Sequence, residues 1–195
     1  MYDKSNITET HFRVLSLFTK GFNRGFYIRE VHQVLGISPS TAQLILNDLE
    51  KKAVLESSLR GKTRVYNLRK ALISQEYLIF AEHYKTILFL EKHLKIKEFL
   101  SKIPAYLEGI GLIFGSYAKG LEKEDSDLDL FIVGPCDRKK IEAAGEIYNL
   151  RVSVKNYPLK TFQENLKSDV LIREVLDNHT VVFNAEGFVR MVQNG

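Results

Sequence analysis

The chain has 195 residues, which gives room for one large or two small domains. Its composition is that of a globular protein, with 45% hydrophobic and 27% charged residues, and no apolar run is long enough to span a bilayer. The single cysteine, Cys136, excludes an internal disulfide and a cysteine-based zinc site, and the first ten residues lack the apolar core of a signal peptide. We therefore expect a cytoplasmic protein that has no membrane partner.

The net charge of +4 is unevenly distributed along the chain. Residues 1–70 hold twelve Lys/Arg and six Asp/Glu, whereas the remaining residues hold sixteen and eighteen. This asymmetry favours a nucleic-acid partner for the N-terminal third, although ordinary variation in surface charge would give the same numbers.

The first 70 residues predict three helices followed by a β-hairpin. Apolar residues from Phe12 to Phe18 predict a first helix that starts at Thr8 or Thr10 and is ended by Gly21 and Gly25. A short strand at residues 27–28 precedes a second helix at 29–35, which Gly36 ends as a C-cap. Ser38 as N-cap and Pro39 at the first helical position open a third helix that runs through Lys52. Strands at 54–57 and 63–68 follow, joined around Gly61.

This order of elements resembles the winged helix-turn-helix domains of small prokaryotic transcription regulators, with VHQVLGISPSTAQLILNDLEKKAVLE as the turn and the third helix. The resemblance implies that residues 1–70 bind double-stranded DNA, with the start of the third helix in the major groove. The candidate contacts of that helix are short polar residues: Ser38, Ser40, Thr41, Gln43 and Asn47. The candidate phosphate contacts of the hairpin are basic: Arg60, Lys62 and Arg64. Against DNA binding, the base-reading face of the third helix has no arginine or lysine, and winged helices also serve as protein-binding modules.

Residues 71–100 contain neither proline nor glycine. They predict a long amphipathic helix that links the N-terminal and C-terminal domains. Its apolar residues follow steps of four and three, as in a heptad seam: Ile73, Tyr77, Phe80, Tyr84 and Ile87. This 73–87 seam predicts either a homodimer contact or packing on the chain's own domains. Because Pro104 breaks the pattern, we assign residues 71–102 to a linking or dimerisation helix.

The most informative motif is GSYAKGLEKEDSDLDLFIV, which runs from Gly115 to Val133. The apolar run 110–114 ends at Gly115-Ser116, which predicts a buried strand entering a helix N-terminus, where backbone N–H groups suit phosphate. Asp127 and Asp129 lie two residues apart on the next predicted strand, so they point to one face and offer oxygen ligands to Mg²⁺. A phosphate cradle facing a Mg²⁺ site is the minimum apparatus of nucleotide chemistry.

The motif resembles the signature of the DNA polymerase β-type nucleotidyltransferase superfamily, especially its minimal nucleotidyltransferase branch, over roughly residues 85–195. The resemblance implies a mixed sheet with helices for residues 103–195, and so an α/β (α+β) multidomain chain. It also implies that Gly115 and Ser116 hold the triphosphate of ATP or GTP, with Lys119 adding positive charge. Asp127 and Asp129 are, on the same resemblance, the catalytic carboxylates that ligate Mg²⁺.

The chain departs from this family at the third carboxylate, which active members carry on the next strand. The matching strand reads Leu150 to Lys155, and its central position is Ser153. No Asp or Glu lies between Glu146 and Glu164. Because a serine hydroxyl is neutral and a poor base, we expect a site that holds one metal ion with nucleotide but is weak as a general base.

Three functions are compatible with these patterns. The one that we favour is a DNA-binding regulator whose nucleotidyltransferase domain binds Mg-NTP without a complete catalytic set. The second is an active nucleotidyltransferase, which moves a nucleotide from an NTP to a protein, an RNA or a small molecule and releases pyrophosphate. The third is an antitoxin-like member of a two-component module.

Overall fold

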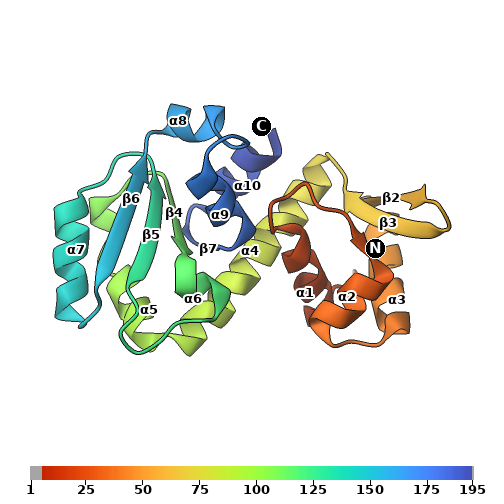
Figure 1. Cartoon of the computed structure of the whole chain (residues 1–195), viewed down its shortest axis with the longest axis horizontal. Helices are drawn as coiled ribbons and strands as arrows, with labels where there is room; N and C mark the ends of the chain where they lie inside the picture. Colours follow the sequence, from red (N-terminus) through yellow and green to blue (C-terminus); the bar gives the residue numbers. More distant parts are fainter. Residues whose placement is uncertain (1–5, 195) are drawn as a thin grey trace, which may run out of the picture. The chain divides into compact units, whose positions relative to one another are not determined.

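The computed structural model describes residues 6–194 and divides the chain into two compact units, with the boundary after Ala81 (Figure 1). Residues 1–5, which belong to the stretch tested above for a signal peptide, lie outside the described residues, as does residue 195. The boundary falls inside helix α4 (Leu72–Lys92), so this helix contributes its first half to one unit and its second half to the other. Within residues 6–194 no helix is long and apolar enough to cross a membrane.

The first unit contains three helices and a small antiparallel sheet. The helices are α1 (Glu9–Phe18), α2 (Ile28–Leu35) and α3 (Pro39–Lys51), and the sheet order is β1 (Phe26–Tyr27), β3 (Thr63–Leu68), β2 (Leu55–Arg60). Their apolar faces form one core, in which Leu15, Leu46 and Tyr66 are fully buried or nearly so. These are the predicted elements in the predicted order, with ends that shift by at most three residues.

Local chemistry explains the tight connection between α2 and α3. Gly36 ends α2 with φ +64°, a left-handed conformation that glycine adopts without steric cost. Ser38 then caps α3, because its hydroxyl accepts a hydrogen bond from the Thr41 N–H at 3.0 Å, and Pro39 occupies the first helical position.

The second unit is built on a four-stranded mixed sheet. Its order is β6 (Val152–Tyr157), β5 (Leu128–Val133), β4 (Ile110–Phe114), β7 (Thr180–Phe183); β5 and β6 are parallel and the other pairs are antiparallel. The remaining elements of this unit are α5 (Leu94–Leu100), the 3-10 helix η1 (Pro104–Tyr106), α6 (Gly115–Lys119), α7 (Arg138–Ile147), α8 (Leu159–Glu164), α9 (Val170–Asp177) and α10 (Ala185–Asn194). Figure 1 shows the strands side by side, with α7 next to β6.

The two faces of this sheet differ in what they carry. One face packs Leu130, Ile132 and Val154 against Phe89 of α4 and Phe99 of α5. On the opposite face, Phe131 stacks on Tyr157 with ring centroids 5.0 Å apart, and Phe114 and Phe162 surround it at 6.1 and 5.9 Å. Because side chains alternate along a strand, Asp129 lies on the same face as Phe131. On this face of β5, the polar residue Asp129 therefore lies next to the aromatic cluster, near the start of the strand.

Two expectations about these elements were wrong. The linking helix is not continuous through Leu100, because it breaks at His93, whose φ and ψ are −119° and 71°. The His93 ring packs at a tilt against Phe89 and meets Tyr117 edge-on, with ring centroids 4.4 and 5.5 Å away. Asp127 does not lie on a strand, because β5 begins at Leu128.

Candidate functional site

The candidate nucleotide site begins where β4 turns into α6. Phe114, the last residue of β4, pairs with Asp129 of β5 in the antiparallel ladder. Gly115 follows with φ +68°, and a Cβ atom there would lie 2.3 Å from Oδ2 of Asp129. Any side chain at Gly115 would therefore displace this carboxylate, so glycine is required both for the turn and for the position of Asp129.

The two aspartates have different environments. Asp127 is exposed, and its Oδ1 lies 2.9 Å from Nε of Arg151, which also donates to the Asp125 carbonyl. Asp129 is half-buried, and its pKa is raised by burial and by the negative charges of Asp127 and Glu174; Lys155 and a hydrogen bond from Ser153 act in the opposite direction. The site thus concentrates negative charge, which a cation would stabilise.

Ser153 stands directly beside Asp129, because these two residues are partners in the parallel ladder between β5 and β6. Its hydroxyl donates a hydrogen bond to the Asp129 carboxylate. Across residues 6–194 the structure contains no group of three or more His, Cys, Asp or Glu arranged to hold a metal ion. The two carboxylates and the serine hydroxyl are all oxygen donors, so they fit a Mg²⁺ ion whose other ligands come from phosphate and water.

Lys119 and Glu174 bring a third element to this site. Nζ of Lys119, at the end of α6, lies 2.8 Å from Oε1 of Glu174 on α9, and Glu174 is near enough to Asp129 to raise its pKa. Glu174, Arg151 and Lys155 are site residues that sequence reasoning missed. No motif surrounds them, because only the tertiary fold brings α9 and the start of β6 to Asp129.

The candidate DNA contacts of α3 are partly exposed. Ser38, Ser40 and Gln43 are exposed, and the Ser38 hydroxyl lies 2.8 Å from the hydroxyls of both Ser40 and Thr41. Thr41 and Asn47 are half-buried, and Oδ1 of Asn47 accepts a hydrogen bond of 2.7 Å from the Tyr66 hydroxyl. This bond connects α3 with β3 and commits the Asn47 oxygen to the interior.

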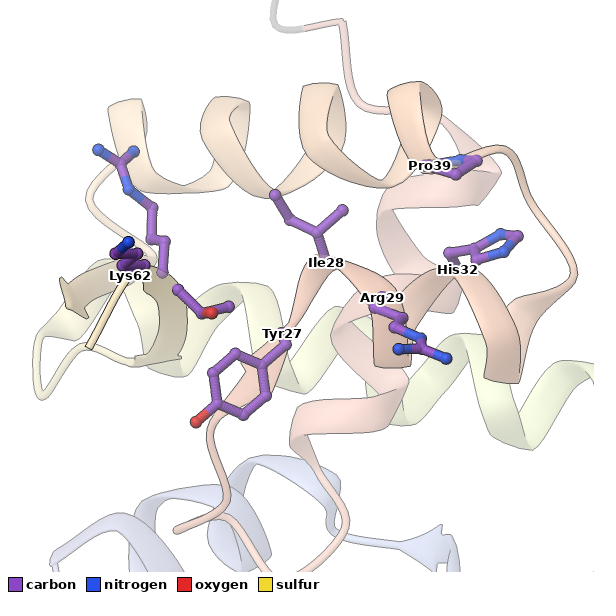
Figure 2. Close-up of a pocket in the computed structure, with 8 residues that line it drawn as sticks. Tyr27, Ile28, Arg29, His32, Pro39 and Lys62 are labelled. Carbon is purple, nitrogen blue, oxygen red and sulfur yellow. The ribbon is translucent and has the colours of Figure 1, made fainter. Parts of the chain in front are cut away.

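Arg60, Lys62 and Arg64 are all exposed on the hairpin. Of the three, Arg64 has an acidic neighbour, Glu50, at 3.5 Å. A pocket of about 410 Å³ lies beside the hairpin (Figure 2). Its lining includes Pro39, Lys62 and Arg64, which the sequence analysis named. The other lining residues were not predicted: Tyr27, Ile28, Arg29, His32 and Thr63.

One comparison with known proteins found a match, and it lies in the second unit. Residues 90–182 match the family model described as a nucleotidyltransferase domain. The comparisons with curated proteins and with solved structures gave no match. The matched segment contains β4, β5 and β6, and with them Gly115, Ser116, Asp127 and Asp129. The C-terminal part of the chain is therefore a nucleotidyltransferase domain built on a mixed α/β fold.

Proposed function

We propose that the chain is a DNA-binding regulator whose nucleotidyltransferase domain binds Mg-NTP without the full set of catalytic carboxylates. One observation carries this proposal: Ser153 stands in register with Asp129, at the position where the family resemblance calls for the third carboxylate. Binding needs an anion cradle and a metal ligand pair, whereas nucleotidyl transfer also needs a group that accepts a proton from the attacking hydroxyl.

Each part of the nucleotide site has a defined task. Gly115 and Ser116 receive the triphosphate, because the glycine lets the backbone approach closely and the serine adds a hydroxyl donor. Asp127 and Asp129 hold the Mg²⁺, which neutralises charge on the phosphates when it is bound. Arg151 provides the counter-charge of Asp127 in the structure, a task that a bound Mg²⁺ would share, and Lys119 contributes a further positive charge from the end of α6.

The first unit supplies the DNA-binding part of the proposal. Three helices, the tight α2–α3 turn and a basic hairpin stand in the order expected of a winged helix. Ser38, Ser40 and Gln43 are exposed at the start of α3, where such a helix enters the major groove. Arg60 and Lys62 are exposed on the hairpin and suit phosphate contacts.

The nucleotide site is tested by replacing both aspartates, Asp127→Asn with Asp129→Asn. We expect calorimetric binding of Mg-ATP or Mg-GTP to fall below detection, because amides carry no charge for the metal, while DNA affinity stays unchanged. Asp177→Asn, on an exposed residue at the end of α9, is the matched control. Equal nucleotide affinity of the double variant and the unaltered protein would contradict the site, as would metal-independent binding.

The DNA interface is tested by Arg60→Ala with Lys62→Ala. We expect weaker binding to every DNA sequence and a log–log salt slope lower by about two, since each lost phosphate contact removes roughly one unit. Fluorescence anisotropy between about 50 and 200 mM salt measures both quantities. Lys95→Ala with Lys97→Ala removes two exposed charges from α5 and serves as the control. An unchanged slope in the hairpin variant would exclude the hairpin from the interface.

Active nucleotidyl transfer is the second candidate function, and the position of Glu174 favours it. This carboxylate is near enough to raise the pKa of Asp129, and in this function it accepts the proton as an acceptor oxygen bonds to the α-phosphorus and pyrophosphate leaves. Incubation with ATP labelled at the α-phosphate tests this function. Transfer of label to the protein or to added RNA, with release of pyrophosphate, would replace the first proposal by the second.

A further inference from the structure

The pocket in the first unit lies at the junction of four segments. It is lined by the end of β1, by residues 28–32 of α2, by the first residue of α3, and by the β2–β3 turn with the start of β3. Figure 2 shows Lys62 on one side, Arg29 and His32 on the other, and Ile28 between them. The volume of about 410 Å³ is within the range of roughly 300–1,000 Å³ that is typical of small-ligand sites.

The positive charges of this pocket are poorly neutralised. Arg29 and Lys62 come from opposite sides, and within residues 6–194 neither side chain forms an ion pair with a carboxylate. Glu30, the neighbour of Arg29 in sequence, is already committed: its carboxylate accepts from the Tyr27 N–H at 2.9 Å and from Arg24 at 3.1 Å. The pocket therefore keeps excess positive charge on both sides, which an anion would neutralise.

The other lining residues define what accompanies the anion. Ile28 and Pro39 give an apolar surface, and the Tyr27 ring lies at the edge of the pocket, where a flat ring can stack on it (Figure 2). Nδ1 of His32 donates to the Ile37 carbonyl at 2.6 Å, so Nε2 is the ring nitrogen available to a ligand. Charged groups on two sides of an apolar centre suit a small molecule that carries both a phosphate and a ring.

We propose that this pocket binds a small phosphorylated ligand of the nucleoside monophosphate class. Arg29 and Lys62 bind the phosphate from opposite sides, and the ring packs on Tyr27 and Ile28. Because Lys62 and Arg64 also belong to the proposed DNA-binding hairpin, a bound ligand competes with DNA for these cations. The competition rests on the proposed DNA-binding function, whereas the pocket itself does not.

The ligand site is tested by titrating AMP into the full-length protein in EDTA, which separates this site from the metal-dependent one. We expect saturable binding, weakened about tenfold or more by Arg29→Ala and by Lys62→Ala, because each removes a charged hydrogen-bond donor. Arg69→Ala, on an exposed arginine of the same unit outside the pocket, should leave the affinity unchanged. Both pocket residues are exposed, and melting curves check that the variants fold.

Three results would overturn the ligand site: no saturable AMP binding up to about 1 mM, equal affinity in both pocket variants, or an equal loss in Arg69→Ala. The competition has its own readout, since AMP should displace labelled DNA from the unaltered protein but much less from Arg29→Ala. If AMP binds and DNA is not displaced, the competition is wrong and the ligand site stands. If the unaltered protein binds AMP but no DNA, the proposed DNA-binding function fails and the pocket assignment does not.

Discussion

Asp129 and Ser153 are neighbours across the β5–β6 ladder, so the side chain at residue 153 directly controls the charge beside Asp129. The serine hydroxyl stabilises the ionised aspartate by a hydrogen bond, which opposes the effect of burial on its pKa. A carboxylate at residue 153 would instead repel Asp129 and add a negative charge to the site, which a bound metal cation would offset.

Ser153→Asp is therefore expected to raise the affinity for Mn²⁺ in the presence of ATP by about tenfold or more, because it adds an anionic oxygen ligand. Calorimetric titration of Mn²⁺ measures the gain. Ser153→Asn, which has a similar shape and no charge, is the control and should not show it. If the Asp and Asn variants titrate alike, residue 153 does not face the metal position.

The join between α4 and the α9–β7 segment depends on a buried charge cluster. Glu82 of α4 and His179 are fully buried, with Oε1 and Nε2 3.0 Å apart, and Lys85 lies 2.9 Å from the same carboxylate. Nδ1 of His179 donates to the Val175 carbonyl at 3.0 Å, which fixes the ring at the end of α9. Burial alone would raise the pKa of Glu82, but Lys85 and His179 outweigh it and lower the pKa from 4.5 to about 2.

A lowered carboxyl pKa in the folded state means that ionised Glu82 contributes stability above pH 4.5, and that this contribution is lost as the pH falls towards 2. Glu82→Gln should therefore reduce the free energy of unfolding by about 3–5 kcal/mol at neutral pH, since it removes the carboxylate that pairs with the mostly buried Lys85 side chain. The difference between variant and unaltered protein should shrink as the pH falls towards about 3, as urea unfolding at several pH values would show. Glu186→Gln, in the exposed pair with Arg190, should cost less than about 1 kcal/mol at any pH.

Local patterns predicted most of the elements, because the chemistry that starts and ends them lies within a few residues. The Gly36–Pro39 turn and the strand before Gly115 are such cases, and both stand where the sequence places them. The break at His93 was missed because no glycine or proline marks it. Its cause is tertiary: the ring meets Tyr117, and Glu122 lies 3.7 Å from Nε2.

The candidate site shows the same division between local and tertiary information. Gly115 and Asp129 meet because β4 and β5, which are joined through the short helix α6, pair with each other. All three elements are close together in the sequence. The ion pair of Asp127 with Arg151 depends on parallel pairing between β5 and β6, which are separated by α7. Glu174 comes from a helix whose sequence gives no sign of its neighbour Lys119. Partners set by long-range packing therefore have to be read from the fold.

Helix α4 carries a stripe of exposed apolar residues. Ile73, Phe80 and Ile87 recur every seven residues and keep 42%, 62% and 55% of their surface exposed. Tyr77, another residue of the predicted heptad seam, packs on the core of the first unit and does not belong to this stripe. Exposed apolar residues at heptad spacing on one helix are typical of a surface that pairs with a second helix. We therefore propose that this stripe, Ile73-Phe80-Ile87, contacts its copy in a second subunit.

A homodimer held by this stripe should dissociate when lysine replaces its two most exposed members, Phe80→Lys with Ile87→Lys, because the paired stripes would then bring like charges together in place of apolar surface. Sedimentation equilibrium should give one chain mass for this variant and two for the unaltered protein. The control is Val170→Lys, which places the same charge on a residue that is 72% exposed on α9, outside the stripe. DNA affinity gives a second readout: a dimer contacts two half-sites with two copies of α3, so the monomeric variant should lose both affinity and about half of the salt slope. If the unaltered protein has the mass of a single chain, the stripe does not form a homodimer. Binding of two DNA half-sites by a dimer held through α4 is then excluded.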